Sequence, residues 1–332
     1  MNNNRTIDLH KHFNCSQLKI KEMEAPEERI RDHIPVIDPN YVFELNFLNH
    51  ILMYLGCPLH DCLYLSGPSG CGKTSAVLQV AARLGWGVEQ LTLSSRSESA
   101  DLIGHATLRR GELVYEYGPL VTAMIYGEIL LLNEIDLMAP GDLAALNDVL
   151  EGKPLTIVAN NAELIRPHRM FRIVATANTK GSGDSLGYYS GARLLNQAFL
   201  DRWRFVELNY PSTRVETSIL KKNAPTLAPA LIGSLVRFAA EIRRVGAPDE
   251  EGKVQLGAPF STRTLIRIGR LLESFPDLSP LEAVDLGFGS RLNKVEREYV
   301  RRLGEDVFGH DKTEESAAEN GQIIAAAMQL AS

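Results

Sequence analysis

The part of the sequence with the clearest chemistry is a glycine-rich segment of eight residues, Gly67-Pro68-Ser69-Gly70-Cys71-Gly72-Lys73-Thr74. It fits the pattern G-x-x-x-x-G-K-[ST], in which glycines let backbone N–H groups curl around phosphate oxygens without a Cβ clash. In this pattern the lysine reaches the β- and γ-phosphates, and the hydroxyl of the last residue ligates Mg²⁺. A chain of this length would match the pattern by chance on the order of once in a hundred cases. The segment therefore predicts ATP and Mg²⁺ as ligands.

The residues on either side have the patterns that such a loop requires. Cys62–Ser66 is an apolar run that predicts a buried strand, and Ser75–Leu84 predicts a helix that ends at Gly85. A helix that starts at the loop adds the positive end of its dipole to the phosphate site. The residues expected to bind the nucleotide here are Gly67, Pro68, Ser69, Gly70, Cys71, Gly72, Lys73, Thr74 and Ser75.

A second candidate feature follows the apolar run Ile129–Leu132, where the chain continues with Asn133 and Glu134. Hydrolytic enzymes with a phosphate loop normally have Asp-Glu here, the Asp holding the water shell of the metal and the Glu polarising the attacking water. Glu134 is therefore the predicted catalytic carboxylate. Asn133 is predicted on the metal side, where an amide oxygen accepts a hydrogen bond but brings no negative charge. We expect weaker Mg²⁺ binding or slower turnover as a result.

A third candidate, Asn178, follows the strand predicted over Phe171–Ala175. A polar side chain at this strand end would lie beside the γ-phosphate and Glu134. Asparagine after a strand is also a common turn former, so the prediction depends on its position behind the two preceding motifs.

The remaining apolar patterns predict the elements that must position these residues. Val88–Leu93 and Arg204–Leu208 predict two more strands, and helical patterns such as Phe43–Leu55 lie between the strands. Strands that alternate with helices indicate an α/β fold with a parallel sheet, here of five strands. After Pro211 only helices are predicted, over Arg214–Asn223, Ala228–Val245, Ser261–Ser274 and Pro280–Phe288.

We expect four segments: an N-terminal extension (1–40), an α/β nucleotide-binding core (41–211), a small all-helical lid domain (212–310) and a C-terminal tail (311–332). In the extension, Glu22–Asp32 predicts a short charged helix or a solvated linker. Two hairpins are predicted in the core, Thr107–Tyr117 with its turn at Arg110-Gly111 and Pro154–Arg166 with its turn at Asn160-Asn161.

The composition limits the classes of function. The 332 residues carry a net charge of −6, from 41 acidic and 35 basic residues, so a surface that is basic throughout is not expected and nucleic-acid binding stays an open question. No run of about 18 apolar residues is present, so no membrane span is expected. The four cysteines form no paired framework and are expected to be reduced thiols of a cytoplasmic protein.

Two further segments complete a resemblance to AAA+ ATPases. Leu200-Asp201-Arg202-Trp203-Arg204-Phe205 closes the α/β part, and Ser261-Thr262-Arg263 opens a helix of the lid domain. With the phosphate loop, Glu134 and Asn178, they resemble most the MoxR branch and its CobS-like members, ATPase subunits of aerobic cobaltochelatases. The resemblance extends from about Ile37 to Ile268. It rests on Asp101-Leu102-Ile103-Gly104, Ile165-Arg166-Pro167-His168, Phe171–Thr179, Gly181-Ser182-Gly183-Asp184, Gly187-Tyr188-Tyr189 and Asn196-Gln197.

This resemblance implies a homo-oligomer, usually a ring of six subunits. It implies that Arg202 reaches the γ-phosphate held by a neighbouring subunit, with Arg204 as a second candidate, and that Arg263 contacts the nucleotide of its own subunit. A surface ion pair is the alternative role for each arginine. The resemblance also implies that the two hairpins face the pore of the ring, and that a partner protein has a von Willebrand factor A domain.

Three functions remain open at this point. The first is an ATP-driven subunit that remodels a partner protein, with metal insertion as a specialised version. The second is a nucleotide-switched assembly module or DNA-associated module with weak turnover, which Asn133 favours. The third is a phosphate-loop kinase, against which Arg263 and the segment Leu200–Phe205 argue.

Overall fold

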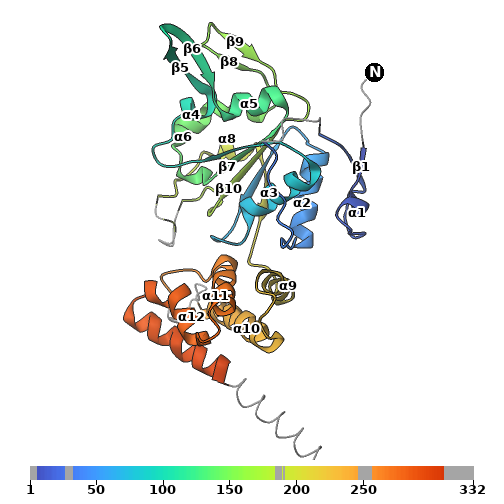
Figure 1. The fold of residues 1–332 in the computed structure, drawn as a ribbon. Helices are drawn as coiled ribbons and strands as arrows, with labels where there is room; N and C mark the ends of the chain where they lie inside the picture. Colours follow the sequence, from blue (N-terminus) through green and yellow to red (C-terminus); the bar gives the residue numbers. More distant parts are fainter. Residues whose placement is uncertain (1–5, 27–32, 184–188, 190, 246–255, 310–332) are drawn as a thin grey trace, which may run out of the picture. The chain divides into compact units, whose positions relative to one another are not determined.

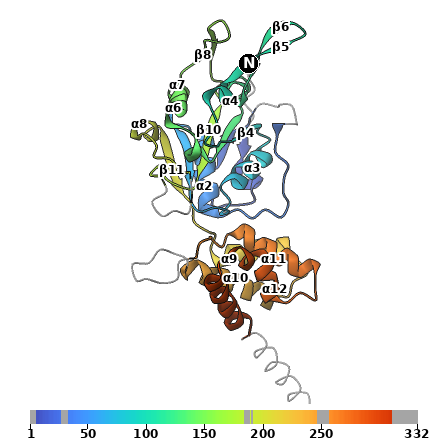
Figure 2. The same cartoon turned by 90° about the vertical axis from the view of Figure 1, so that its left-hand side faces the viewer.

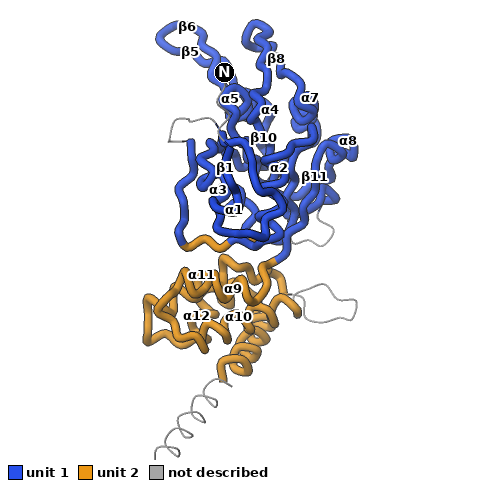
Figure 3. The backbone as a smooth tube through the Cα atoms, turned by 90° about the vertical axis from the view of Figure 1, so that its right-hand side faces the viewer, with its two compact units in different colours: residues 1–39, 43–68, 72–209 blue, residues 40–42, 69–71, 210–332 orange. Residues whose placement is uncertain are grey.

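The computed structural model describes residues 6–26, 33–183, 189, 191–245 and 256–309. Four predicted segments lie wholly or partly outside these residues: 27–32 of the charged segment, 184–188 of the glycine-rich stretch, 246–255 in the helical domain, and the tail 311–332. The chain divides into two compact units (Figure 3). The first unit comprises residues 1–39, 43–68 and 72–209, and the second comprises residues 40–42, 69–71 and 210–332.

The first unit is built on a sheet of five strands, all of them parallel, and this confirms the predicted α/β fold (Figure 1). The strand order is β11-β3-β10-β7-β4. The three inner strands are buried along their whole length, as expected for a parallel sheet that is covered on both faces. The five strands of the sheet are β3 (Cys62–Ser66), β4 (Val88–Thr92), β7 (Ile129–Asn133), β10 (Arg172–Ala177) and β11 (Trp203–Glu207).

Helices cover this sheet. Helices α2 (Leu45–Gly56) and α3 (Lys73–Leu84) pack against each other, and α3 ends at Gly85 in the left-handed conformation, as predicted. The other face of the sheet shares one apolar core with α5 (Pro119–Tyr126) and the shorter helices. The shorter helices are α4 (Ser99–Ile103), α6 (Pro140–Leu143), α7 (Asn147–Leu150) and α8 (Gln197–Leu200).

Both predicted hairpins are confirmed, and they project from the same end of the first unit (Figures 1 and 2). The first joins β5 (Gly104–Arg109) to β6 (Glu112–Tyr117), and the second joins β8 (Leu155–Ile157) to β9 (Glu163–Ile165). The turn residues Arg110 and Gly111 both have positive φ, 54° and 87°, as a two-residue hairpin turn requires. The Tyr117 hydroxyl lies 2.8 Å from the Glu163 carboxylate and so links the two hairpins.

The prediction for residues 22–24 was wrong. Residues Glu22–Glu24 form strand β2, which pairs antiparallel with β1 (Thr6–Asp8) across the short helix α1 (Leu9–His12). The pairing buries Met23 to 5% exposure. A charged local sequence favoured a helix or linker, but the backbone hydrogen bonds and the burial of Met23 come from residues distant in the chain.

The second unit is helical, as predicted. Its elements are α9 (Thr213–Asn223), α10 (Pro229–Val245), α11 (Thr262–Ser274) and α12 (Pro280–Gly287), and residues 294–309 form a further helix that the sequence reasoning missed. Apolar residues of all five helices form one core. Across the described part of both units, no helix combines the length and the apolar content needed to cross a membrane.

Candidate nucleotide-binding site

The glycine-rich loop connects β3 to α3 in a backbone conformation that only glycine adopts readily. Gly67, Gly70 and Gly72 have φ values of 146°, 73° and 103°. A Cβ on Gly67 would also lie 2.2 Å from the Leu208 carbonyl oxygen. The N-cap residue of α3 is Gly72, so no side chain at that position caps the first turn of the helix. This backbone fits a phosphate group.

The Lys73 side chain lies inside this loop. Its ammonium group donates to the carbonyl oxygens of Gly67 at 2.6 Å and Pro68 at 3.1 Å, and to Asn178 Oδ1 at 3.1 Å. The residue is only 7% exposed. A buried ammonium held by the loop carbonyls is a cation positioned for an anionic ligand, because carbonyl oxygens satisfy its hydrogen bonds without neutralising its charge.

Asn133, at the end of β7, lies beside the hydroxyl that the sequence assigned to Mg²⁺. Thr74 Oγ1 donates to Asn133 Oδ1 at 2.6 Å, and Thr176 Oγ1 donates to the same oxygen at 3.1 Å. The Asn133 side chain is buried, and its Nδ2 has no hydrogen-bond partner among the described residues. A hydroxyl, an amide oxygen and the nearby Glu134 carboxylate are hard oxygen donors, so the residues present fit Mg²⁺.

Glu134 and Asn178 are in direct contact. Asn178 Nδ2 donates to Glu134 Oε2 at 2.8 Å, while Asn178 Oδ1 accepts from Lys73. Asn178 therefore connects the predicted catalytic carboxylate to the lysine that is predicted to bind phosphate. Glu134 has a left-handed backbone, φ 56° and ψ 43°, which is uncommon outside glycine and marks a residue held in place by its surroundings.

Three residues of this region were missed by the sequence reasoning. Thr176 donates to Asn133 from within β10, and Asp136 is 1% exposed and accepts from the backbone N–H and hydroxyl of Thr179 at 3.0 and 2.8 Å. Tyr64 lies in β3. Burial, followed by the charges of Asp136 and Glu134, raises the pKa of its phenol, so the phenol stays neutral. The only available signal was the position of Asp136 two residues after Glu134.

The predicted arginines occupy different surroundings. Arg202 Nε and Nη2 donate to Glu151 Oε1 at 2.9 and 2.5 Å, and Arg204 makes two bonds to the Asp61 carboxylate at 2.8 and 2.9 Å. Both are therefore in ion pairs of their own chain. Arg263 lies in the first turn of α11, exposed, in the second unit.

Four more residues of the glycine-rich loop and of α3 were predicted to bind the nucleotide, namely Ser69, Gly70, Cys71 and Ser75. Ser75 is exposed in α3 and donates to the Gly72 carbonyl oxygen, and Cys71 is buried and does not form a disulfide. Ser69, Gly70 and Cys71 are grouped with the second unit.

Both the α/β part and the helical part of the chain are similar to known protein families. Residues 63–202 match the family described as AAA domain (dynein-related subfamily), and residues 216–293 match the CbbQ/NirQ/NorQ C-terminal family. Aerobic cobaltochelatase subunit CobS of Sinorhizobium sp is 30% identical over 286 residues, which cover 83% of each chain. Protein NorQ of Paracoccus denitrificans is 29% identical over 63% of this chain and 76% of its own. Von Willebrand factor A domain-containing protein 8 of Mus musculus is 25% identical over 66% of this chain, but only 12% of its own.

Proposed function

Because the chain belongs to the AAA+ ATPases of the MoxR type, with CobS and NorQ among its relatives, we propose that it hydrolyses ATP to remodel a partner protein. The observation that carries the proposal is the connected set Lys73–Asn178–Glu134 beside the glycine loop. It combines a phosphate-binding cation, a polar residue that contacts it, and a carboxylate that can accept a proton. A site that only bound nucleotide would not need the carboxylate.

Each side chain has a distinct role in this proposal. Bound Mg²⁺–ATP supplies the phosphoanhydride bond that is cleaved. Lys73 exchanges its loop carbonyls for phosphate oxygens, and Thr74 and Asn133 hold the metal side. Glu134 orients the attacking water and accepts its proton at a carboxylate oxygen, while the Asn178 amide fixes that carboxylate through its donated hydrogen bond.

We place this activity in a homo-oligomer, in the proposal a ring of six. Arg202 is the residue that acts on the nucleotide of the neighbouring subunit, and Arg204 is the second candidate. Since Arg202 is bound to Glu151 within its own chain, it must exchange one acidic partner for another, the γ-phosphate. Arg263 acts on the nucleotide of its own subunit from α11.

The two hairpins support an interaction with a partner protein. Leu108 and Leu113 on the first hairpin are 71% and 76% exposed, and Val158 next to β8 is 81% exposed. Apolar side chains gathered at projecting turns are typical of surfaces that bind proteins. A protein with a von Willebrand factor A domain is the partner we propose, and the name of the mouse relative supports this choice. Metal insertion, which the name of the CobS relative suggests, is the specialised version.

Asn133 favours a second candidate, a nucleotide-switched assembly module with weak turnover. Its side chain brings no charge to the metal side, and its Oδ1 accepts from two hydroxyls of the protein, those of Thr74 and Thr176. In this version the conformational change accompanies binding of ATP and hydrolysis only resets it. Salt-dependent binding to DNA would be expected if the partner were a nucleic acid, because phosphate contacts release counterions.

The test is the steady-state ATPase rate and ATP affinity of four variants. Lys73→Ala is expected to lose ATP binding, and Glu134→Gln to bind ATP while turnover falls by about 10²-fold or more. Lys11→Ala and Glu305→Gln are the matched controls, since both side chains are exposed and lie in other parts of the chain. Unchanged turnover in both Lys73→Ala and Glu134→Gln would contradict the proposed site.

A further inference from the structure

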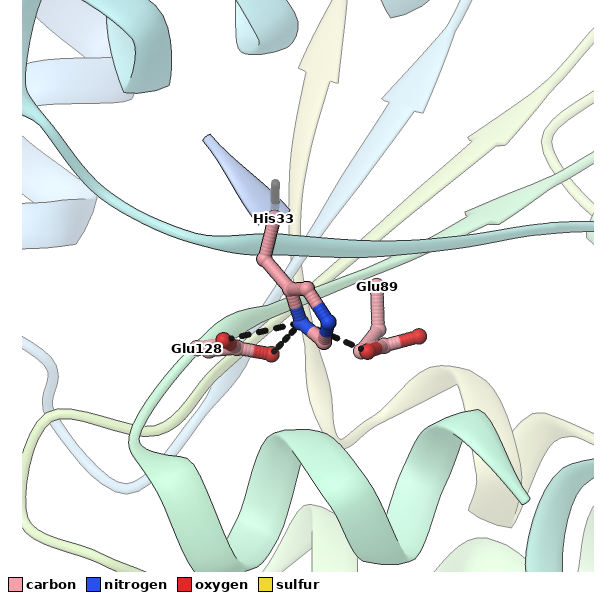
Figure 4. Close-up of side chains that lie close together, drawn as sticks. All are labelled: His33, Glu89 and Glu128. Atoms are coloured by element: carbon pink, nitrogen blue, oxygen red, sulfur yellow. Dashed lines mark hydrogen bonds and ion pairs between the residues drawn. The ribbon is translucent and has the colours of Figure 1, made fainter. Parts of the chain in front are cut away.

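Three titratable side chains meet at the end of the sheet opposite the nucleotide site. Glu89 is the second residue of β4, Glu128 directly precedes β7, and His33 comes from the N-terminal extension (Figure 4). His33 Nδ1 lies 3.1 Å from Glu128 Oε1, 3.2 Å from Glu128 Oε2 and 3.1 Å from Glu89 Oε1. One ligand atom from each of the three residues lies within 4.8 Å of the other two. The candidate nucleotide site, in contrast, follows the carboxyl ends of β3, β7 and β10.

Hydrogen bonding alone accounts for only part of this arrangement. Nδ1 of an imidazole carries at most one proton, yet three carboxylate oxygens lie at nearly equal distances from it. The same spacing is expected for ligands that surround one ion. Ligand atoms about 2.0–2.2 Å from a Zn²⁺ ion lie roughly 3.0–3.5 Å from each other at tetrahedral to octahedral angles.

Within these three side chains, two carboxylates face a single imidazole. Glu128 is 3% exposed, and the side chain of Glu89 is 21% exposed. Two carboxylates that share a single imidazole repel each other, and a divalent cation between them would remove that repulsion.

Gly87 provides the space that the Glu128 carboxylate occupies. A Cβ at position 87 would lie 2.7 Å from Glu128 Oε1 and 2.9 Å from its Cδ. Gly87 does not have a left-handed backbone, so its own conformation does not demand glycine. The absence of a side chain at this position instead keeps the buried carboxylate directed at His33.

We propose that His33, Glu89 and Glu128 bind one divalent transition-metal ion, with Zn²⁺ the ion that one imidazole nitrogen and two carboxylates fit. Three protein ligands leave a further position for water. The site is structural. It fastens the segment that contains His33 to the amino ends of β4 and β7, and it is independent of the ATPase activity proposed above.

The test uses the full chain, stripped with a chelator and dialysed against Zn²⁺ without nucleotide. We expect one bound Zn²⁺ per chain and a rise in the thermal midpoint on Zn²⁺ addition. Glu128→Gln, which keeps the shape of the side chain, and His33→Ala should each lower the affinity by at least about tenfold and remove the rise in midpoint. Thr74→Ala should keep both, because Thr74 belongs to the nucleotide site.

The chain offers a matched control for adventitious binding. Cys57 is an exposed free thiol three residues before His60, and this pair could capture Zn²⁺ on its own. The double variant Cys57→Ser, His60→Ala should therefore bind Zn²⁺ like the unaltered chain. Two results would overturn the proposal. One is Zn²⁺ binding that is lost in this double variant but kept in His33→Ala. The other is that no Zn²⁺ binds even at about 100 μM, a concentration at which weak sites are occupied. If Glu128→Gln fails to fold, Glu89→Gln on the edge strand gives the same discrimination.

Discussion

At the scale of single residues, Asn133 determines the charge beside the Thr74 hydroxyl, where we propose that Mg²⁺ binds. Its Oδ1 accepts from the hydroxyls of Thr74 and Thr176, while its Nδ2 is buried without a partner among the described residues. An aspartate here would place a second carboxylate oxygen where Nδ2 now lies. That oxygen would be buried and would have no hydrogen-bond donor until a cation was bound. The folding stability of the variant should therefore depend on Mg²⁺.

The first prediction is that Asn133→Asp strengthens Mg²⁺ binding in the presence of ATP by about tenfold, because the added carboxylate charge attracts the cation. A tenfold change in affinity corresponds to roughly 1.4 kcal/mol. Without Mg²⁺ the same variant should unfold at a lower temperature than the unaltered chain, because the added charge is uncompensated. Titration of ATPase rate against Mg²⁺ and thermal melts with and without Mg²⁺ measure the two effects. Asn161→Asp, in an exposed turn, is the control. Identical Mg²⁺ titrations would show that Asn133 does not limit the metal site.

The second prediction concerns Asn178, whose amide touches both Lys73 and Glu134. Asn178→Ala should lower kcat by about 10²-fold, the usual cost of losing one positioned donor, with ATP affinity changed far less. The reason is that Lys73 and the glycine loop, which bind the phosphates in the proposal, are unaltered, while the Glu134 carboxylate loses the amide that orients it. Separate measurement of ATP dissociation constant and kcat checks this. Loss of affinity with an unchanged kcat would make Asn178 a binding residue only.

Sequence alone predicted the residues of this site that belong to contiguous motifs, and missed those that act across strands. Lys73, Thr74 and Glu134 stand at fixed positions relative to a glycine pattern or an apolar run. Thr176 reads as an ordinary β-branched strand residue, and only the pairing of β10 with β7 brings it to Asn133. Glu151, which holds Arg202, lies 51 residues away in sequence. No local pattern encodes such a contact.

At the scale of elements, the second unit contains a buried charged contact that joins three helices. Glu216 of α9 is 1% exposed, and its carboxylate accepts from Arg243 of α10 at 2.8 and 2.9 Å and from Thr262 of α11 at 2.7 Å. Removing one partner of a buried pair leaves the other charge uncompensated, which costs more than the pair contributes.

The third prediction is that Glu216→Ala destabilises the second unit by about 3–5 kcal/mol, whereas Asp285→Ala, which breaks an exposed pair with Arg297, costs at most about 1 kcal/mol. Both tryptophans, Trp86 and Trp203, lie in the first unit. Denaturant unfolding followed by tryptophan fluorescence should therefore stay unchanged in Glu216→Ala, while the helical circular dichroism signal shifts to lower denaturant. Equal shifts of both signals would mean that the two units do not unfold separately.

The elements that sequence predicted well are those with strong periodicity and clear ends. Helix α3 ends at Gly85 in the left-handed conformation, and the buried run of β7 has no polar residue before Asn133. Strand β2 and the helix over 294–309 were missed for a different reason. The strand is three residues long with one buried side chain, and the helix carries charged residues on its exposed face that resemble a solvated tail. Both depend on partners elsewhere in the chain.

At the scale of the whole molecule, the proposal depends on whether one subunit completes the site of the next. Within one chain, Arg202 pairs with Glu151 and Arg204 pairs with Asp61. If Arg202 acts on a neighbour, its loss should reduce turnover by about 10³-fold or more while the ATP site of the same chain stays intact. Lys73→Ala has the opposite defect, because it retains Arg202 but cannot hold ATP.

The fourth prediction follows from combining these two defects. Arg202→Ala and Lys73→Ala subunits, each inactive alone, should recover activity when co-expressed in one oligomer. In a random one-to-one mixture, an intact ATP site faces an intact Arg202 at about a quarter of the interfaces, whatever the size of a closed ring. The ATPase rate of the mixture should therefore approach a quarter of the unaltered rate. Arg202→Ala mixed with the double variant Arg202→Ala, Lys73→Ala contains no Arg202 and should stay inactive. A first mixture no more active than the sum of its two components would mean that Arg202 is not supplied by a neighbour, and its ion pair with Glu151 would then be its role.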